Sequence, residues 1–431
     1  MSYIELINIT LVTVVTLGFI AFIISDRINI SYIPLLIILG LLFGPTFGFI
    51  ERKEAQHVFD YARVFGLVMI LYAEGHNLKW KLIKKHLLTI GLLDTVGLFV
   101  TAIIGGYMFS LLFHLPFAAG FLFGAIISAT DPATLIPLFK QNKVDENIRT
   151  VIVTESIFND PLGIVLTVLA VALVVPQATE AHLVEEIARY TTLYPAAVIF
   201  FLYEIISSVL IGVILGFIGY WIVKKLKPGL FPQIFGLAMA YGGFLVGEYV
   251  QTSGYLVATT IGIVFGNYNQ IFKKIEKNPV FEGFVEKELD FNEKLADLAT
   301  VFIFILIGAS MSLSVLGKTF IKGSILALGI VFIARPIAGL MLLPLKRWSF
   351  KQYLFISLEG PRGVVPSALA GLPLSLGLMY HDPKLTGWGE IILSATILTV
   401  LISVLAETLW VKPLSQRLLR NKKNDEAAMI E

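Results

Sequence analysis

Two apolar stretches that carry acidic side chains decide the fold class: FAAGFLFGAIISATDPATLIPLF at residues 117–139 and TVIVTESIFNDPLGIVLTV at residues 150–168. A helix needs about 20 mostly apolar residues to cross the hydrocarbon core of a bilayer, and both stretches reach about that length. An ionisable side chain at the bilayer centre costs at least about 2.5–3.5 kcal/mol, so it is retained where it has a function. The two stretches therefore predict membrane-spanning helices that carry a polar site.

The rest of the chain has the composition of a membrane protein. Of its 431 residues, 56% are hydrophobic and 15% are charged, against about a quarter charged in a soluble domain, and the mean hydropathy is +0.82. We predict an all-α polytopic membrane protein that lies in the lipid bilayer. The formal net charge of +2 gives no reason to expect a nucleic-acid partner. No cysteine is present, which excludes disulfides and thiolate ligands, and no resident cofactor is predicted.

Thirteen apolar runs predict thirteen transmembrane helices, and the positive charges between them give an orientation. With the N-terminus outside, the inner loops and the C-terminal tail hold 24 Lys and Arg residues and the outer segments hold 6. Because cytoplasmic loops retain positive charge, we predict the N-terminus outside and the C-terminus in the cytoplasm. The first run has no Lys or Arg ahead of it, so it is predicted to be a span and not a signal peptide. The predicted spans are 4–25, 30–50, 58–77, 87–113, 117–140, 148–175, 195–223, 231–249, 253–268, 296–315, 321–345, 353–377 and 387–411.

The fifth predicted span is expected to break near its centre. Asp131 is followed at once by Pro132. Proline removes a backbone donor and disfavours helical conformation in the residue before it, so we expect Thr130, Asp131 and Thr134 to occupy unwound backbone. Open backbone at this depth is tolerated only where it lines a cavity or is covered by protein.

The sixth predicted span places four polar side chains on one helix face. Glu155, Ser156, Asn159 and Asp160 are separated by the spacings at which helical side chains are neighbours. Two carboxylates this close cannot both be ionised in a low dielectric unless a cation is near. A structural cluster would more often use Ser, Thr and Asn alone, so the pattern favours ion or proton binding.

Arginines inside later spans supply the opposite charge. Arg335 lies in the eleventh predicted span, and Arg362 lies within SLEGPRGVVPSALAGLP (357–373) in the twelfth. A buried Arg without a carboxylate partner is prohibitive, so we predict a fixed pair of Arg335 with Glu155 and place Arg362 near the break of span twelve. Glu359 is expected closer to the cytoplasmic end, in a structural role.

The two broken spans indicate an internal repeat. In the predicted topology, span five runs inward and span twelve runs outward, and Pro361, Gly363 and Pro366 interrupt span twelve. Inverted repeats whose broken helices meet at the midplane are typical of secondary transporters. If spans four to six repeat as spans eleven to thirteen, the two broken helices cross beside Asp160. Each then presents one positive and one negative helix end to the other.

The charges of these residues leave one negative charge. Asp131, Glu155 and Asp160 contribute −3, and Arg335 and Arg362 contribute +2. One monovalent cation or one proton would neutralise the site, so we predict that the two compete for one carboxylate and are exchanged one for one. Asp160 is the predicted carrier of Na⁺ and H⁺, with Asp131 and Ser156 as further oxygen ligands of the kind that hard cations prefer.

Other acidic residues of the spans are weaker candidates. Glu74 lies near the cytoplasmic end of span three, where an interfacial acid and an ion ligand are equally good interpretations. Asp94, Glu204 and Glu248 are single acids in spans four, seven and eight. We predict structural roles for these three.

At these residues the chain resembles the monovalent cation/proton antiporter family of the NhaP and sodium/proton exchanger type. The resemblance rests on ATDPAT (129–134), TESIFNDP (154–161), the Arg-Pro pair of span eleven and GPRGVV (360–365). The thirteen-span layout extends it over essentially the whole chain. The motifs are together highly specific for that family.

The resemblance implies roles for particular residues. Asp160 would bind both the ion and the proton, and Glu155 would pair with Arg335. Glu74 falls where prokaryotic members have a further ion ligand, and Asn159 in place of a second Asp is similar to the electroneutral branch. The remaining members of the implied ion shell are Thr130, Asp131 and Ser156.

The resemblance also implies a homodimer in which a six-helix core moves against a dimerisation domain, elevator fashion. The charged stretch 269–295 is predicted to be an amphipathic cytoplasmic connector. Residues 412–431 are predicted to be a short cytoplasmic tail without room for a nucleotide-binding domain. The implied segments are dimerisation helices at 1–86, core helices at 87–175 and 321–411, and interface helices at 195–268 and 296–315.

Electroneutral exchange of Na⁺, and of Li⁺, for H⁺ is the function that these features favour, in a prokaryotic inner membrane and without enzymatic activity. K⁺/H⁺ exchange on the same scaffold is the nearest alternative, because oxygen ligands do not settle the size of the ion. A cation channel would need a symmetric filter of carbonyls or carboxylates, which the sequence does not suggest. An intramembrane aspartyl protease is disfavoured because Arg335 and Arg362 would compete for its carboxylates.

Overall fold

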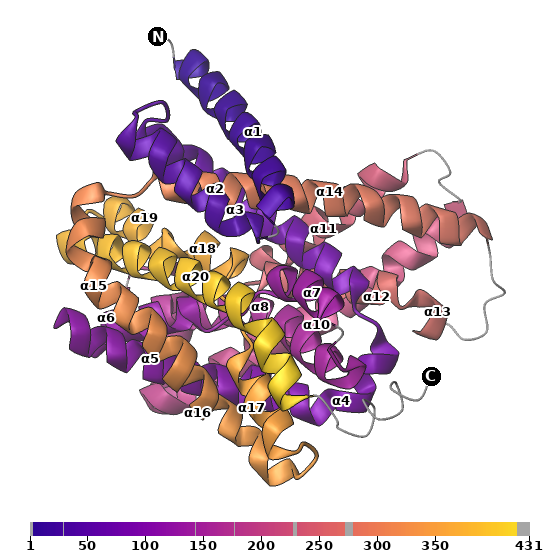
Figure 1. Ribbon diagram of the computed structural model, residues 1–431. Coiled ribbons are helices and arrows are strands. Elements are labelled where there is room, and N and C mark those ends of the chain that lie inside the picture. The colour runs from indigo at the N-terminus through magenta and orange to yellow at the C-terminus, as the bar shows by residue number, and fades with distance from the viewer. Residues whose placement is uncertain are drawn as a thin grey trace.

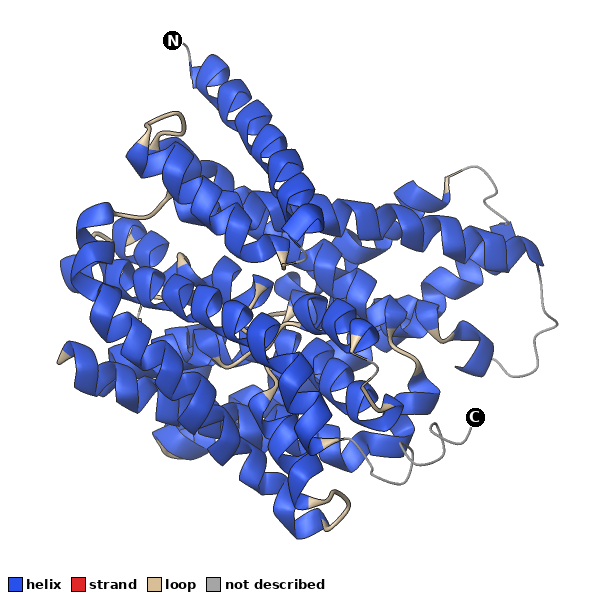
Figure 2. Cartoon of the chain, in the orientation of Figure 1, coloured by secondary structure: helices blue, strands red, loops and turns tan. Residues whose placement is uncertain are grey.

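The structure, a computed structural model, describes residues 3–28, 30–142, 144–175, 177–226, 231–271 and 279–419. All regular secondary structure in these ranges is helical (Figure 2). In lipid every backbone polar group must be satisfied internally, which a helix does by itself. The helices are α1 (Tyr3–Ile28), α2 (Tyr32–Leu41), α3 (Arg52–Asn77), α4 (Trp80–Leu92), α5 (Leu98–Phe113), α6 (Phe117–Ile127), α7 (Pro132–Gln141), α8 (Glu146–Val174), α9 (Thr179–Tyr190), α10 (Leu193–Leu226), α11 (Pro232–Tyr249), α12 (Gly254–Gly266), α13 (Tyr268–Ile271), α14 (Pro279–Ala309), α15 (Leu313–Gly329), α16 (Arg335–Gly339), α17 (Phe350–Leu358), α18 (Val364–Ala370), α19 (Leu372–Met379) and α20 (Pro383–Leu418).

Each of the thirteen predicted ranges contains helix in the structure. Within the described residues, six helical segments are long and apolar enough to cross a membrane, and four shorter segments are strongly apolar. The number of crossings and their direction stay predictions. The six long segments are Glu5–Ile28, Ile83–Phe113, Glu146–Val174, Leu193–Lys225, Leu313–Leu345 and Pro383–Leu418, and the shorter ones are Tyr32–Thr46, Phe117–Ile127, Gly254–Gly266 and Val364–Met379.

The predicted repeat is visible in the order of the elements. A helix with a π-helical turn, a broken helix and a long unbroken helix follow one another in each half of the chain. The first set is α4 and α5 joined through η2 (Leu93–Gly97), then α6 and α7, then α8. The second set is α15 and α16 joined through η3 (Ile330–Ala334), then α17 and α18, then α20. Figure 1 shows α8 near the middle of the helix bundle, with α1 projecting from one end.

The segment predicted as a connector differs from the structure. Residues 269–271 belong to α13, residues 272–278 lie outside the described residues, and 279–295 form the first part of the continuous helix α14. The span predicted at 296–315 therefore begins within α14 and runs past its end at Ala309. Its bounds in the membrane stay a prediction. Two polar residues of the charged stretch lie on the buried face of this helix at helical spacing: Glu288 and Asn292 are fully buried, and Asn292 Nδ2 donates to the Glu288 carbonyl at 2.8 Å.

Part of the predicted tail at 412–431 is helical in the structure. Helix α20 continues to Leu418, past the predicted end of the last span at residue 411. Residues 420–431 lie outside the described residues. An additional helix that the sequence analysis does not predict, α9, follows α8 and packs against both α8 and α10.

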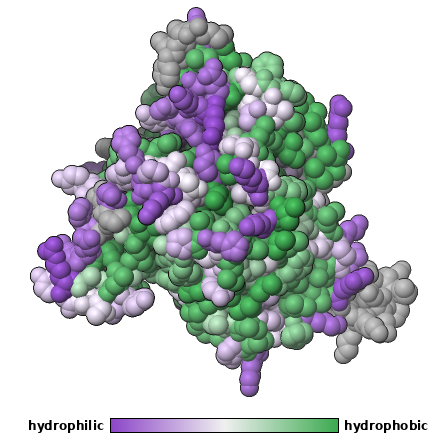
Figure 3. All heavy atoms as spheres, turned by 90° about the vertical axis from the view of Figure 1, so that its left-hand side faces the viewer, coloured by the Kyte–Doolittle hydropathy of each residue, from purple (hydrophilic) through white to green (hydrophobic). Residues whose placement is uncertain are grey.

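The outer surface is apolar over large areas. Figure 3 shows hydrophobic residues over much of one face, with hydrophilic residues gathered in separate patches. On α1, the side chains of Val12 and Phe19 are 67% and 68% exposed. Apolar surface of this extent is unusual on a soluble monomer, and it fits the lipid surroundings that the hydropathy predicts.

Small residues let neighbouring helices approach closely in the core. Helices α5 and α6 meet along Gly106, Gly120 and Gly124, and a Cβ added at Gly124 would overlap the carbonyl oxygen of Ala102. Because lipid tails are as apolar as the side chains, helix association in membranes relies on such close packing. The glycines thereby hold α6, which leads into the first break, against α5.

We expect Gly124→Ala to lower the free energy of unfolding by about 1–3 kcal/mol, because the extra methyl group overpacks the α5–α6 contact. Thermal unfolding of the purified protein in detergent would measure the change. Gly91→Ala is the matched control, since Gly91 lies in α4 and a Cβ there meets nothing within 4 Å. Equal stability of the two variants would show that the α5–α6 approach does not depend on glycine.

Candidate functional site

The first break lies between α6 and α7. Helix α6 ends at Ile127, α7 begins at Pro132, and Asp131 is the N-cap of α7. The Oδ2 atom of Asp131 accepts hydrogen bonds from the backbone N of Thr134 at 3.1 Å and from its hydroxyl at 2.6 Å. A carboxylate at a helix N-terminus satisfies free backbone donors and is favoured by the helix dipole. Thr134, predicted in the break, therefore lies in the first turn of α7.

The second break lies between α17 and α18 and touches the first. Helix α17 ends at Leu358 and α18 begins at Val364. The backbone N of Asp131 donates to the carbonyl oxygen of Pro361 at 2.8 Å. Gly363 allows this approach, because a Cβ there would overlap the Asp131 side chain. The two unwound segments are thus joined by a direct backbone hydrogen bond.

Arg362 connects the second break to the helix end of the first. Its side chain is 1% exposed, and Nη1 donates to the carbonyl oxygens of Ser128 and Ala129 at 3.3 and 3.2 Å. These carbonyls follow the last turn of α6, where the helix dipole is negative. The guanidinium therefore places its positive charge at the negative end of α6. Arg362 itself lies in the second break, as predicted.

The polar face of α8 closes over Thr130. The Asn159 side chain accepts from the Thr130 backbone N at 2.9 Å, and its Nδ2 donates to Thr130 Oγ1 at 2.8 Å and to Glu155 Oε1 at 3.0 Å. The hydroxyls of Thr130 and Ser156 are 2.9 Å apart. An ionised Asp at position 159 would have no donor for Glu155, so the amide is what lets this network form.

Glu155 and Arg335 form a bidentate ion pair. Arg335 Nη1 and Nη2 donate to the two carboxylate oxygens of Glu155 at 2.7 and 2.8 Å. The Arg335 side chain is 6% exposed and the Glu155 side chain is 1% exposed. Arg335 also donates from Nε and Nη2 to the carbonyl of Glu359, at 3.3 and 3.2 Å. The guanidinium therefore neutralises Glu155 and also satisfies a carbonyl of the second break.

Asp160 differs from Asp131 and Glu155 because one of its carboxylate oxygens makes no hydrogen bond within the described ranges. Its side chain is buried, at 3% exposure, and Oδ1 has no hydrogen-bond partner among the described residues. Glu74 and Asp131 are its electrostatic neighbours, and Glu74 Oε2 likewise has no partner in the described part of the chain. No three acidic or histidine side chains of the described residues converge as a metal site. A cation here would also need hydroxyl or backbone oxygens.

Three buried acids join this cluster although the sequence analysis gives them no place in it. Glu359 lies in the second break, as the residue that follows α17, and it is fully buried. Its position relative to the cytoplasmic end stays a prediction. Asp94 is buried and interacts electrostatically with Glu155 and Arg335. Glu407 of α20 was missed, although an acid within the last predicted span is the signal that identifies the others. Its neighbours come from other spans, so sequence spacing could not reveal them.

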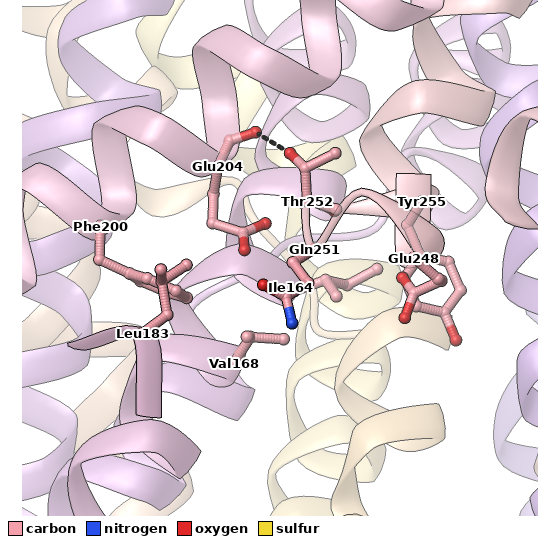
Figure 4. A pocket seen from close by; sticks show the side chains of 10 residues that line it. Ile164, Val168, Leu183, Phe200, Glu204, Glu248, Gln251, Thr252 and Tyr255 are labelled. Carbon is pink, nitrogen blue, oxygen red and sulfur yellow. Dashed lines mark hydrogen bonds between the residues drawn. The ribbon is translucent and has the colours of Figure 1, made fainter. Parts of the chain in front are cut away.

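Glu204 and Glu248 both line a separate cavity of about 260 Å³. Figure 4 shows the Glu204 side chain on the side of Thr252 and the Glu248 side chain on the side of Tyr255. Thr252 Oγ1 donates to the Glu204 carbonyl at 3.2 Å, and the backbone N of Gly254 donates to Glu248 Oε1 at 3.2 Å. None of the carboxylates around Asp160 lines this cavity, so these two acids do not belong to the cluster on α8.

Comparison with known proteins gives matches over most of the chain. A family model described as "Sodium/hydrogen exchanger, transmembrane" matches residues 11–417. The chain is 32% identical over 423 residues to "Probable Na(+)/H(+) antiporter 2" of Methanocaldococcus jannaschii, covering 93% of this chain and 94% of that protein. It is 27% identical over 367 residues to "K(+)/H(+) antiporter NhaP2" of Shewanella sp. (strain ANA-3), covering 82% of this chain and 58% of that protein.

A solved structure agrees with the fold. The sodium proton antiporter MjNhaP1 from Methanocaldococcus jannaschii, at pH 8, superposes with a TM-score of 0.85 at 30% sequence identity. The match covers 98% of this chain and 100% of that chain. Sequence and fold are therefore similar over nearly the whole length, which includes both breaks and α8.

We expect Arg335→Ala to lower the free energy of unfolding by about 3–5 kcal/mol, because it leaves Glu155 buried and unpaired. Thermal unfolding in detergent would measure the loss. Lys294→Ala is the control: Lys294 forms an exposed pair with Asp290 at 2.6 Å, and removing such a pair changes stability little. If Arg335→Ala were as stable as wild type, the ion pair would not be holding the cluster together.

Proposed function

Because the chain belongs to the sodium/hydrogen exchanger family, we propose that it exchanges Na⁺ for H⁺ across a membrane through the carboxylate of Asp160. The chain is a multi-pass membrane protein and a transporter rather than an enzyme, as its relatives are antiporters. The observation that carries the proposal is the Oδ1 atom of Asp160, which is buried and has no hydrogen-bond partner among the described residues.

The surrounding charges leave Asp160 as the exchangeable one. Glu155 is neutralised by Arg335, and Asp131 is stabilised as the cap of α7 while Arg362 offsets the negative end of α6. Asn159 adds no charge. A sodium ion and a proton each bring a single positive charge, so either one neutralises Asp160, and both cannot do so at once. Exchange in a ratio of one to one is then electroneutral.

Coupling follows from the cost of a buried charge. An ionised carboxylate without a partner is costly in a low dielectric, so we propose that the core moves across the membrane only when Asp160 carries a cation or a proton. The empty, charged state would then stay on one side. Cation binding on one side and proton binding on the other would follow without any further gate.

The ion shell that we propose consists of Asp160 with oxygens from Thr130, Ser156 and Asp131. One Asp131 oxygen is used by the α7 cap, so Asp131 contributes mainly through its charge. Glu74 lies on α3, and its carboxylate interacts electrostatically with Asp131 and Asp160. We propose it as a further ligand that is engaged only when the core is next to α3.

An elevator movement and a homodimer complete the proposal. The core would consist of the two repeated sets around α8 and α20, and it would move against α3 together with α12 and α14, each of which packs on α3. Li⁺ would be carried as well as Na⁺, because the same oxygens serve both. K⁺/H⁺ exchange is the second candidate, since a relative of that name matches 82% of the chain, and the same assay distinguishes the ions.

In proteoliposomes with an imposed ΔpH, we expect Na⁺ and Li⁺ to dissipate the gradient with wild-type protein, with no effect of clamping the membrane potential. Asp160→Asn should abolish the signal because it can neither ionise nor accept a proton. Glu248→Gln is the control, since it changes an acid outside the cluster. Dissipation by K⁺ alone would overturn the ion assignment, and activity that survives in Asp160→Asn would overturn the mechanism.

Competition at one carboxylate predicts a pH dependence of apparent affinity. At pH values below the pKa of Asp160, protons compete with Na⁺ for the carboxylate. The apparent KM for Na⁺ should then rise about tenfold for each unit that the pH falls, by mass action. The maximal rate at saturating Na⁺ should stay constant over this range, with equal pH on both sides. Initial rates measured over a series of Na⁺ concentrations would test this. A falling maximal rate with constant KM would mean that the two ions use different groups.

A further inference from the structure

The unwound backbone of the second break takes its hydrogen bonds from α20. The backbone N of Gly360 donates to Glu407 Oε1 at 2.8 Å, and the backbone N of Arg362 donates to Ser403 Oγ at 2.9 Å. Ser403 and Glu407 are four residues apart, so they lie on one face of the helix. Buried backbone donors are almost always paired, and here two side chains of α20 replace the missing helical partners.

The carboxyl groups of Glu359 and Glu407 meet at this place. Glu359 is fully buried and Glu407 is 2% exposed. The two side chains lie close enough to interact electrostatically. Neither carboxyl oxygen of Glu359 has a hydrogen-bond partner among the described residues. Two ionised carboxylates have no donor between them, so the contact becomes favourable only when one of the two carries a proton.

The environments of the two groups decide which one is ionised. Glu407 accepts hydrogen bonds from the Gly360 backbone N at 2.8 Å and from Trp410 Nε1 at 3.2 Å. Donors of this kind stabilise a carboxylate. Glu359 receives none, and a charge buried without donors is costly. The remaining charge on Glu407 faces Arg335, with which it interacts electrostatically.

We propose that Glu359 and Glu407 hold one proton between them, carried by Glu359, and that ionised Glu407 is a positioning residue for the second broken helix. The proton binds permanently and is not part of the exchange at Asp160. Glu407 fixes Gly360, and through this segment it sets Pro361, whose carbonyl accepts from the backbone N of Asp131. This inference rests on the proposed function where it says that the segment serves the exchange site.

The retained proton is consistent with the charges around Arg335. Asp94, Glu155 and Glu407 all interact electrostatically with this one guanidinium. A second ionised carboxylate at Glu359 would add a negative charge that no further arginine of the cluster offsets, because Arg362 donates to carbonyls of the first break. Protonation of Glu359 removes this charge while its backbone carbonyl still accepts from Arg335.

Infrared spectroscopy of the full-length protein in lipid at neutral pH tests the proton directly. A protonated carboxyl group has a C=O stretching band that an ionised carboxylate lacks. Glu359→Gln is expected to lose one such band, while Glu286→Gln, which changes an exposed acid of α14, keeps them all. If Glu359→Gln keeps every band, Glu359 carries no proton and the proposal is overturned. The measurement needs no transport, so its result is independent of the proposed exchange.

Exchange assays in proteoliposomes test the positioning role. Glu359→Gln, which can still donate to Glu407, should keep a rate close to that of wild type and the same pH profile. Glu407→Ala leaves the Gly360 donor unpaired and should lower the maximal rate about tenfold. Glu407→Gln should restore most of that rate, since its carbonyl oxygen can accept from Gly360. A shifted pH profile in Glu359→Gln, or a wild-type rate in Glu407→Ala, would overturn the proposal.

Discussion

The contact between two unwound segments inside the bundle is the constraint on which the rest of the structure depends. Backbone groups removed from water must find partners within the protein, and each break solves this with residues of the other half. Asp131 N donates to the Pro361 carbonyl, and Arg362 donates to the carbonyls that end α6. Neither broken helix could persist in lipid alone. The requirement therefore holds the two repeats together at the point where their polar residues are concentrated.

The same constraint selects the residues around the breaks. Arg335 joins Glu155 to the end of α17, and Asn159 joins Glu155 to Thr130. Each of these side chains is used for more than one bond, so the cluster is satisfied with few charges. The Oδ1 atom of Asp160 has no hydrogen-bond partner among the described residues, which is also true of Glu74 Oε2. In the proposed exchange, this open oxygen is what lets Asp160 bind an ion or a proton.

Residues that act through a local pattern could be predicted, and those that act through packing could not. Asp131 before Pro132 indicates a break from adjacent residues alone, and Glu155 and Asp160 share a helix face at a known spacing. The partner of Glu155 followed from charge balance, because a buried Arg needs an acid. Glu407 was missed and Asp94 was taken as isolated, because both meet the cluster across helices that are distant in sequence. The continuity of α14 from the charged stretch into the next apolar run was not predicted, because a charged stretch can also carry a buried helix face.

By itself the sequence determined that this chain is helical and embedded in a membrane, that two helices are broken and which acids and arginines lie within the apolar segments. These properties follow from hydropathy, from proline and from the cost of a buried charge, all of which act on neighbouring residues. Only the tertiary structure decided which polar groups are satisfied and which are not. That outcome depends on distances between helices, and it separates Asp160 from Asp131 and places Glu359 beside Glu407.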